Sequence, residues 1–151
     1  MSAAATHSYN AVEIHEYVTM RVSGQLFGIA VQAVQDVLRS QKITRIPQAP
    51  KEIAGSLNLR GRIVTAIYLR ARLGLTPLEP GTKTMSVVVE HKGEFFSLIV
   101  DSVGDVLSLE REHFESNPTN LNPKWRDVSA GLYRLKGELL VIIDIQNLLK
   151  F

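Results

Sequence analysis

Short runs of β-branched and aromatic residues recur along the chain, and turn dipeptides that contain glycine separate them. The runs include YVTMRV and QLFGIAV in the first part of the chain and EFFSLIV and ELLVIID in the later part. Residues of these types are typical of β-strands, and glycine supplies the positive φ that a tight antiparallel turn needs. The turns fall at Ser23-Gly24, Arg60-Gly61, Lys92-Gly93 and Lys136-Gly137. The pattern therefore predicts four β-hairpins.

Apolar residues also recur at helical spacing between the hairpins. Valines lie three residues apart within residues 31–38, and the same spacing returns within residues 100–107. This periodicity predicts a short helical turn in each segment. Two further short helices are predicted at residues 69–73 and 145–150.

The chain also aligns with itself. A shift of 69 residues places residues 23–38 on 92–107 without a gap, and a shift of 76 places residues 55–73 on 131–149. The difference of seven residues falls in the long connection of the second half. Because each half is too short to bury a stable hydrophobic core by itself, the repeat predicts two copies of one small unit that share a core.

A linker rich in proline and glycine, GLTPLEPGTK, divides the two copies near residue 80. We predict a flexible N-terminal tail over residues 1–15, followed by a single domain over 16–151. Within that domain the first barrel is expected at about 16–76 and the second at about 82–151, and an exchange of strands between them is left open. The predicted class is mainly β, with two small barrels or curled sheets and short helices.

Composition narrows the chemistry that the chain can carry. Its 151 residues are 45% apolar and 21% charged, which is typical of one globular domain. The absence of cysteine excludes disulfides, thiolate zinc sites, iron–sulfur clusters and thiol nucleophiles. The N-terminus does not read as a secretory signal, and the most apolar stretch, residues 139–149, is interrupted by polar residues. We therefore expect a cytoplasmic protein without membrane insertion.

Charge is distributed unevenly. Residues 39–72 carry a net charge of +7, whereas residues 1–38 sum to −2 and residues 73–151 to −3. This polarity favours acidic or head-to-tail protein partners. It also raises a second hypothesis, a small basic double barrel that binds nucleic acid, although Tyr68 is the one aromatic residue within the basic segment that could stack on a base.

No motif for catalysis or for a cofactor is recognisable. The four histidines lack metal-ligand spacing, and the chain has no GxSxG, GxxxxGK[ST] or GxGxxG sequence. Asp101 and Asp105 lie four residues apart and are interpreted as a solvated helix face. We predict no catalytic residue, no metal site, no cofactor and no enzymatic activity. For Arg60, whose counterpart in the repeat is Lys136, a binding role and a structural role stay open.

Three segments together resemble the CheW family, adaptors that couple chemoreceptors to the histidine kinase CheA. They are FGIAVQAVQDVL, KITRIPQAPKEIAGSLNLRGRIVTAIYLRARLGL and LIVDSVGDVLSLE, and the similarity runs from about Glu16 to Phe151. The resemblance implies two five-stranded SH3-like β-barrels and a non-catalytic adaptor in bacterial chemotaxis. It also implies recruitment from the cytoplasm to membrane-associated arrays of methyl-accepting chemotaxis proteins.

The resemblance also implies two binding surfaces. The groove for the cytoplasmic tip of the receptor would be lined by Val34, Asp36, Arg60, Met85 and Val106. The surface for the regulatory domain of the kinase would involve Ile43, Thr44, Gly55 and Ile63. Ring assembly with kinase regulatory domains stays open. Where the family reads close to VPVIDLR, this chain has VTAIYLR at residues 64–70, so a proline and an acid are lost.

Overall fold

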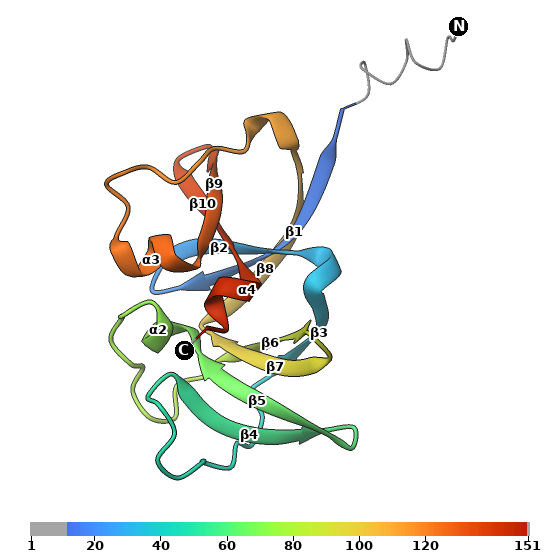
Figure 1. Ribbon diagram of the computed structural model, residues 1–151, viewed down its shortest axis with the longest axis vertical. Coiled ribbons are helices and arrows are strands. Elements are labelled where there is room, and N and C mark those ends of the chain that lie inside the picture. The colour runs from blue at the N-terminus through green and yellow to red at the C-terminus, as the bar shows by residue number, and fades with distance from the viewer. Residues whose placement is uncertain (1–11, 151) are drawn as a thin grey trace, which may run out of the picture.

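The computed structural model describes residues 12–150, and in them ten β-strands form two five-stranded sheets (Figure 1). Sheet I has the strand order β8-β1-β2-β10-β9, and sheet II has the order β3-β6-β7-β5-β4. The strands of sheet I are β1 (Ile14–Val22), β2 (Gln25–Ala30), β8 (Ser102–Glu110), β9 (Ser129–Leu135) and β10 (Glu138–Ile143). The strands of sheet II are β3 (Val34–Arg39), β4 (Ile53–Leu59), β5 (Arg62–Tyr68), β6 (Met85–His91) and β7 (Glu94–Val100).

The four predicted hairpins are confirmed. β1 pairs with β2, β4 with β5, β6 with β7 and β9 with β10, each time antiparallel and around a predicted glycine turn. At the β4–β5 turn both residues have positive φ, 53° at Arg60 and 80° at Gly61. This combination is the two-residue turn whose twist matches that of the flanking strands.

The sheets do not follow the two halves of the sequence. Sheet I joins β1 and β2 to strands from the second half, and sheet II joins β6 and β7 to strands from the first half. Two parallel pairs, β2 with β10 and β5 with β7, make these connections. The exchange of strands that the sequence left open is therefore present, and each sheet draws on both copies instead of following the approximate bounds 16–76 and 82–151.

The start of the chain differs from the predicted tail at residues 1–15. Residues 1–11 lie outside the described residues, so most of that prediction has no structural counterpart. β1 already begins at Ile14, where it pairs with Glu110 of β8, and the Arg111 amide donates to the Glu13 carbonyl oxygen at 2.8 Å. The backbone hydrogen bonds of a neighbouring strand thus order residues that the sequence pattern assigned to the tail.

The helical turns predicted at 31–38 and 100–107 are wrong in most of their length. The first segment forms only a 3₁₀ turn, η1 (Val31–Ala33), before β3 begins, and the second is the end of β7 followed by β8. A β-bulge interrupts the register of each strand, between Val34 and Asp36 in β3 and opposite Val18 to Met20 in β8. The extra residue of a bulge turns the two-residue period of a strand into a spacing of three, which imitates a helix.

The other helices are short. The predicted helices at the ends of the repeated units are confirmed as α2 (Leu69–Arg72) and α4 (Ile145–Leu148). A further turn, η2 (Arg111–His113), and α3 (Pro123–Val128) lie in the long connection between β8 and β9.

The sheets are curled, and their outer strands are not joined by a ladder. A single antiparallel bridge lies at each open side, between Thr44 and Ser56 in sheet II and between Glu115 and Leu132 in sheet I. Ser56 and Leu132 are equivalent positions of the repeat. The predicted five-stranded units are therefore present as nearly closed barrels that use the same closure in both copies.

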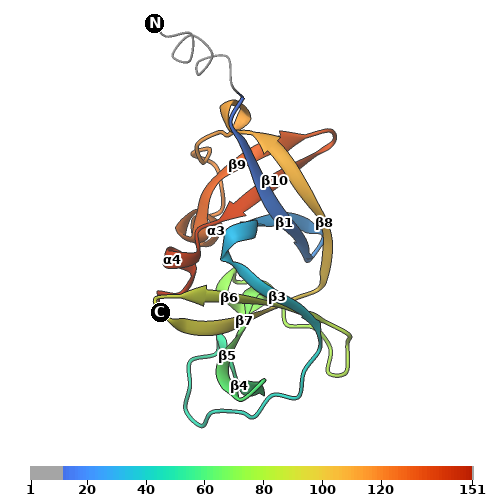
Figure 2. The same ribbon diagram turned by 90° about the vertical axis from the view of Figure 1, so that its right-hand side faces the viewer.

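The hydrophobic core has three parts. One cluster lies within each curled sheet, and the largest lies between the two sheets and receives side chains from both. Figures 1 and 2 show the two sheets one above the other, with this junction between them. Met20, Phe27 and Ile67 in this shared core are fully buried. Each side chain of this size stabilises the fold by about 1.5–3 kcal/mol on burial, so the two sheets depend on each other.

Candidate functional site

An ion pair joins the two polar residues that the family resemblance assigned to the receptor groove. Nη1 of Arg60 lies 3.0 Å from Oδ2 of Asp36. Asp36 is on the outer strand β3, and its Oδ1 accepts a hydrogen bond from the Val37 amide. Arg60 lies in the β4–β5 turn, where the Asn58 side chain accepts a hydrogen bond from the Gly61 amide. The turn chemistry therefore sets the direction in which the guanidinium projects.

The two partners differ in their contact with solvent. The Arg60 side chain is 75% exposed, whereas that of Asp36 is 24% exposed. A guanidinium has five N–H donors in a planar fork, and a single contact with Asp36 leaves others facing solvent. Arg60 can thus bind a carboxylate or carbonyl group of a partner while Asp36 holds it in place.

The structure places the apolar members of the same predicted set less closely together. Val34 lies two residues before Asp36, and Met85 begins the neighbouring strand β6, opposite Arg39; both pack against the shared core. Val106 belongs to the other sheet, where it pairs with Val18 of β1 and is 53% exposed. Four of the five residues are therefore in or beside sheet II, and Val106 is across the junction of the sheets.

Three of the four residues predicted for the kinase surface meet at one place. The amide and carbonyl groups of Thr44 exchange hydrogen bonds of 2.8 Å with Ser56. Gly55 lies beside this bridge with φ of 146°, and a Cβ there would be 2.2 Å from the Thr44 carbonyl oxygen and 2.8 Å from the Ile43 side chain. Only glycine fits this position, since a Cβ would collide with backbone.

The repeat contains a second glycine in the same role. Gly131, the counterpart of Gly55, has φ of 151° and faces Phe114 and the carbonyl oxygen of Glu115 beside the other closing bridge. Because the glycine recurs in both copies, closure of the curled sheets accounts for it. Gly55 thus supports the backbone on which Ile43 and Thr44 lie.

Ile63 stands apart from the other members of the kinase set. It pairs with Asn58 near the β4–β5 turn and is 68% exposed. Beside it, the Arg62 guanidinium lies 4.2 Å from the centre of the Phe95 ring. The exposure excludes a core role for Ile63. The tip of this hairpin carries one residue of each predicted surface, Arg60 and Ile63, within three positions.

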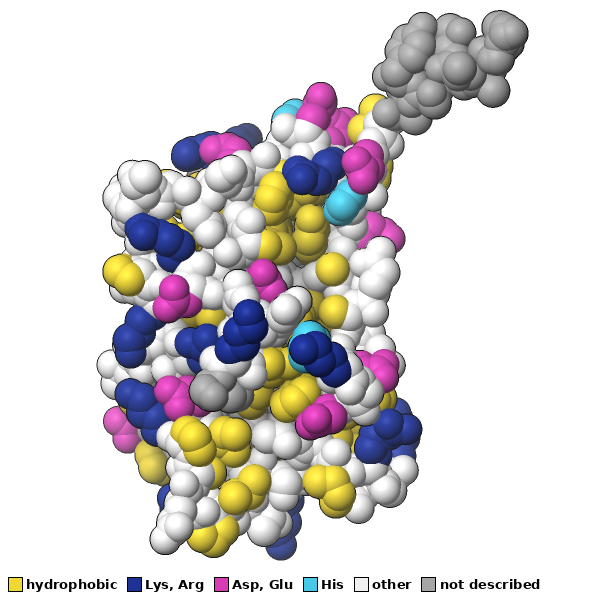
Figure 3. All heavy atoms as spheres, viewed as in Figure 1, with side chains coloured by type: hydrophobic (Ala, Val, Ile, Leu, Met, Phe, Trp, Pro, Cys, Tyr) yellow, Lys and Arg dark blue, Asp and Glu magenta, His cyan; other side chains and the backbone are white. Residues whose placement is uncertain are grey.

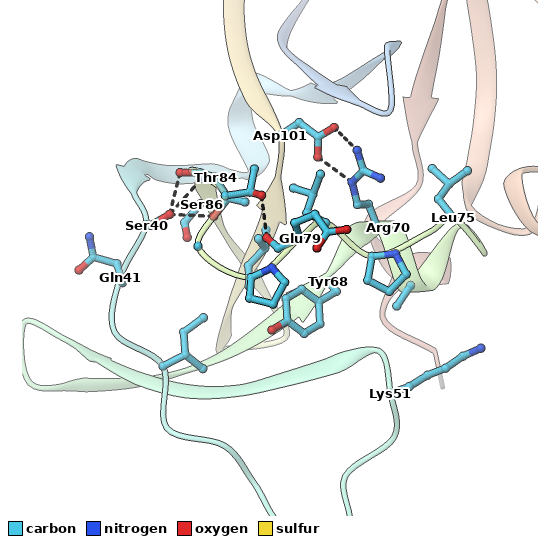
Figure 4. Close-up of a pocket in the computed structure, with 18 of the residues that line it drawn as sticks. Ser40, Gln41, Lys51, Tyr68, Arg70, Leu75, Glu79, Thr84, Ser86 and Asp101 are labelled. Atoms are coloured by element: carbon cyan, nitrogen blue, oxygen red, sulfur yellow. Dashed lines mark hydrogen bonds and ion pairs between the residues drawn. The ribbon is translucent and has the colours of Figure 1, made fainter.

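A hollow under the linker was missed by the sequence analysis. It has a volume of about 560 Å³ and lies between residues 74–84 and the end of sheet II that carries Tyr68 (Figure 4). Arg70 and Asp101 form one of its walls. The Nε and Nη2 atoms of Arg70 donate to the two carboxylate oxygens of Asp101 at 2.9 and 2.6 Å.

The Arg70–Asp101 pair ties three parts of the molecule together. The Ser23 amide in the β1–β2 turn donates to Asp101, and Arg70 donates through Nη1 to the carbonyl oxygen of Thr76 in the linker. The hydrogen bond from Arg70 holds the pKa of Asp101 below its ordinary value, although partial burial opposes this effect. The interpretation of Asp101 as part of a solvated helix face is therefore wrong. The sequence analysis placed Asp101 on a helix because the bulge in β8 gives the valines a spacing of three residues, which imitates a helix.

The basic segment is less available for nucleic acid than its net charge implies. Arg60 pairs with Asp36, Arg70 pairs with Asp101, and Arg62 covers Phe95. Arg72 donates hydrogen bonds to carbonyl oxygens at the end of α4, including that of Leu148 at 3.0 Å. Half of the eight basic side chains in residues 39–72 thus have intramolecular contacts.

One group of side chains has the spacing of metal ligands. Ligand atoms of Glu110, Glu112 and His113 lie within 4.8 Å of one another. They surround the exposed turn η2, and the His113 ring contacts the carboxylates of Glu110 and Glu112 at 3.7 and 3.8 Å. Exposed acidic groups of this kind are common without a metal, so no ion is assigned to them.

The described helices can be compared with the length that a helix needs to cross a membrane. Among residues 12–150, none has the length and apolar character needed to cross one.

Comparisons with known proteins agree on one family. The family model described as a CheW-like domain matches residues 16–151. The chain is 32% identical over 133 residues to the chemotaxis protein CheW of Bacillus subtilis, and this alignment covers 87% of this chain and 85% of that protein. It is 30% identical over 151 residues to the chemotaxis protein CheW of Klebsiella aerogenes, with 99% and 91% covered. Among solved structures, the scaffolding protein TtCheW from Thermoanaerobacter tengcongensis superposes with a TM-score of 0.83 at 26% identity, covering 92% of this chain and 94% of that one.

Proposed function

The chain belongs to the CheW-like domain family, and on that basis we propose that it is a non-catalytic adaptor that couples chemoreceptors to the histidine kinase CheA. The observation that carries this proposal is the match of residues 16–151 to the CheW-like domain model, together with the similarity to proteins named chemotaxis protein CheW and to the fold of a scaffolding protein. An adaptor needs two surfaces that bind different partners at the same time. The geometry supports one candidate for each.

The receptor surface centres on the Asp36–Arg60 pair. Its exposed guanidinium can select a partner by charge, and the exposed Val106 across the junction supplies apolar area, to which the partly buried Val34 and Met85 add. Charged groups at the edge of an interface contribute mainly to specificity and association rate, whereas apolar side chains contribute most of the affinity. The proposed occupant is the cytoplasmic tip of a chemoreceptor.

The proposed kinase surface has two parts on sheet II: Ile43 and Thr44 at the closing bridge, with Gly55 beside them, and Ile63 near the β4–β5 turn. Ile63 carries the largest exposed fraction among the exposed large apolar side chains of the described residues. An isolated exposed isoleucine that becomes buried on binding is a typical anchor of a protein interface. The proposed occupant is the regulatory domain of CheA.

The proposed role places the protein in the cytoplasm and recruits it to membrane-associated receptor arrays. No chemical step belongs to it. Assembly into rings with kinase regulatory domains would follow if the two sheets can bind kinase independently, and this part of the proposal stays open.

A binding experiment with purified components tests the proposal. The full chain is mixed with CheA and with a soluble receptor fragment, and complexes are separated by size-exclusion chromatography. We expect binary complexes with each partner and a ternary complex with both. Absence of both binary complexes would refute the adaptor role. Affinity for single-stranded oligonucleotides that falls steeply with salt would instead favour the nucleic-acid hypothesis.

A further inference from the structure

Tyr68 occupies a helix position where a tyrosine does not help the helix. It is the N-cap residue of α2, and its side chain makes no capping hydrogen bond. Its counterpart in the repeat is Asp144, the N-cap residue of α4, whose carboxylate accepts a hydrogen bond from the Asn147 amide at 3.2 Å. Since aspartate is among the best N-cap residues, helix stability does not explain the tyrosine in the first copy.

The Tyr68 side chain is instead placed between two hollows. One is the 560 Å³ hollow under the linker, and the other, of about 680 Å³, lies under residues 45–51. Tyr68 and Lys51 line both. We call the two together the Tyr68 groove. In Figure 4 the Tyr68 ring lies among the side chains that line the first hollow, with Arg70 and Asp101 above it and Lys51 below it.

The walls of the Tyr68 groove mix apolar and polar side chains, and the apolar ones come largely from two loops. Tyr68 is 45% exposed and Ile46 is 42% exposed, so the core buries neither side chain fully. Figure 3 shows exposed hydrophobic side chains at this end of the molecule. Prolines and other apolar residues of the two loops complete the walls: Pro47, Pro50, Pro77, Leu78 and Pro80. An exposed aromatic ring beside a hollow can receive an extended peptide segment, as the aromatic-lined grooves that bind extended proline-rich peptides do.

The charge around the Tyr68 groove is positive. Arg45, Lys51 and Lys124 line it, against Glu79 alone, because Arg70 and Asp101 neutralise each other. An occupant with acidic side chains therefore complements the rim. The N-terminal segment of this chain does not meet that requirement, since residues 1–11 contain no aspartate or glutamate.

We propose that the Tyr68 groove binds an extended acidic peptide segment of another protein. An apolar side chain of that segment enters a hollow beside the Tyr68 ring, and acidic side chains on either side of it lie near Arg45 and Lys51. This site goes beyond the adaptor role and involves neither Asp36 nor Arg60. Ile43 lines the groove and also belongs to the proposed kinase surface, so the test leaves Ile43 unchanged.

Selection from a display library of random twelve-residue peptides, with the full chain as bait, tests the proposal. We expect enrichment of peptides in which acidic residues flank an apolar one. The best peptide is then synthesised with a fluorescent label, and its affinity is measured by anisotropy. Tyr68→Ala and Lys51→Glu should each weaken binding about tenfold or more, while Tyr68→Phe should bind within about threefold of the wild type.

Matched controls separate a binding defect from a folding defect. Lys136→Glu makes the same change of charge in a turn of sheet I and should leave affinity unchanged. Thermal unfolding of Tyr68→Ala should stay cooperative and fall only slightly below that of the wild type, because the ring is already 45% exposed and makes no capping hydrogen bond to α2. Failure to enrich acidic and apolar peptides, or equal affinity of wild type and Tyr68→Ala, would overturn the proposal. The assay contains neither kinase nor receptor, so its failure leaves the adaptor role untouched.

Discussion

Arg60 and Asp36 come from opposite edges of sheet II, yet Nη1 of Arg60 lies 3.0 Å from Oδ2 of Asp36. Asp36 is on the outer strand β3, and Arg60 ends the hairpin that carries the other outer strand, β4. The ion pair thus spans the open side of the curled sheet, as the Thr44–Ser56 bridge also does. An ion pair with a largely exposed partner contributes about 0–1 kcal/mol to stability. The contact is therefore better suited to orient Arg60 than to hold the sheet closed.

The exposed position of Arg60 in this ion pair leads to a prediction for its replacement. We predict that Arg60→Ala weakens receptor binding by about 1–3 kcal/mol, because a charge-assisted contact with the partner is lost. The melting temperature should change little, and affinity for the kinase should stay near that of the wild type. Lys136→Ala, at the equivalent turn of sheet I, is the matched control. Titration of each variant against receptor and kinase measures both effects, and a parallel loss of stability and of both affinities would assign Arg60 a structural role instead.

Ile63 allows the complementary experiment. Because its side chain is 68% exposed, Ile63→Asp should leave the circular dichroism spectrum and the melting temperature intact. We predict a loss of at least tenfold in kinase affinity, since an apolar side chain of this size contributes about 1.5–3 kcal/mol when an interface buries it. Ile14→Asp makes the same change at an exposed isoleucine outside both surfaces and should bind the kinase normally. If both variants bind equally well, Ile63 is not part of the kinase surface.

The glycines beside the two closing bridges should be equally intolerant of a side chain. A Cβ on Gly55 or Gly131 would lie within 2.5 Å of a backbone carbonyl oxygen or a ring carbon. We predict that Gly55→Ala and Gly131→Ala each lower the free energy of unfolding by about 2–4 kcal/mol. At Gly137 a Cβ meets open space, so Gly137→Ala should cost only about 1 kcal/mol for its positive φ. Denaturant unfolding measures all three, and equal losses would show that the bridges are not the cause.

Stability should depend on pH through Asp101. Its pKa lies below the ordinary value because Arg70 donates two hydrogen bonds to the carboxylate. A carboxyl with a depressed folded pKa binds its proton more weakly in the folded state than in the unfolded state. Its stabilisation is therefore complete above the unfolded value of 3.8 and is lost as the pH falls through the folded pKa.

The variant Asp101→Asn should remove this dependence. We predict that it costs about 2 kcal/mol at neutral pH, because Arg70 and the Ser23 amide lose a charged acceptor. Its unfolding free energy should then fall less steeply than that of the wild type between pH 5 and about pH 2. Denaturant unfolding at several pH values gives both slopes. Identical slopes would mean that other carboxylates dominate the acid sensitivity.

Local features of the sequence predicted the hairpins and the repeat, because glycine turns and β-branched runs act over a few residues. The sharing of strands between the two copies could not be predicted from such features. It depends on the parallel pairs β2–β10 and β5–β7, whose partners are distant in the chain. The spacing of three residues between Val103 and Val106 led to the wrong prediction of a helical turn, because a bulge separates these two valines within one strand.

For the candidate site, residue chemistry singled out Arg60, and only the family resemblance placed Asp36 in the same groove. Asp36 reaches Arg60 only because the sheet curls until its two edges meet. Arg70 and Asp101 were not recognised as a pair for a similar reason, since the first lies in α2 and the second lies between β7 and β8. Such contacts across a curled sheet are set by its curvature, which no local pattern records.

Reconstituted kinase signalling tests the adaptor role most directly. CheA, receptor and ATP are combined with and without the full chain, and phosphorylation of CheA is followed as receptor ligand is added. We predict that the protein raises the receptor-dependent kinase output and makes it respond to ligand, and that Arg60→Ala and Ile63→Asp each reduce this effect. Kinase output and ligand response that stay the same when the wild-type protein is added would contradict the account.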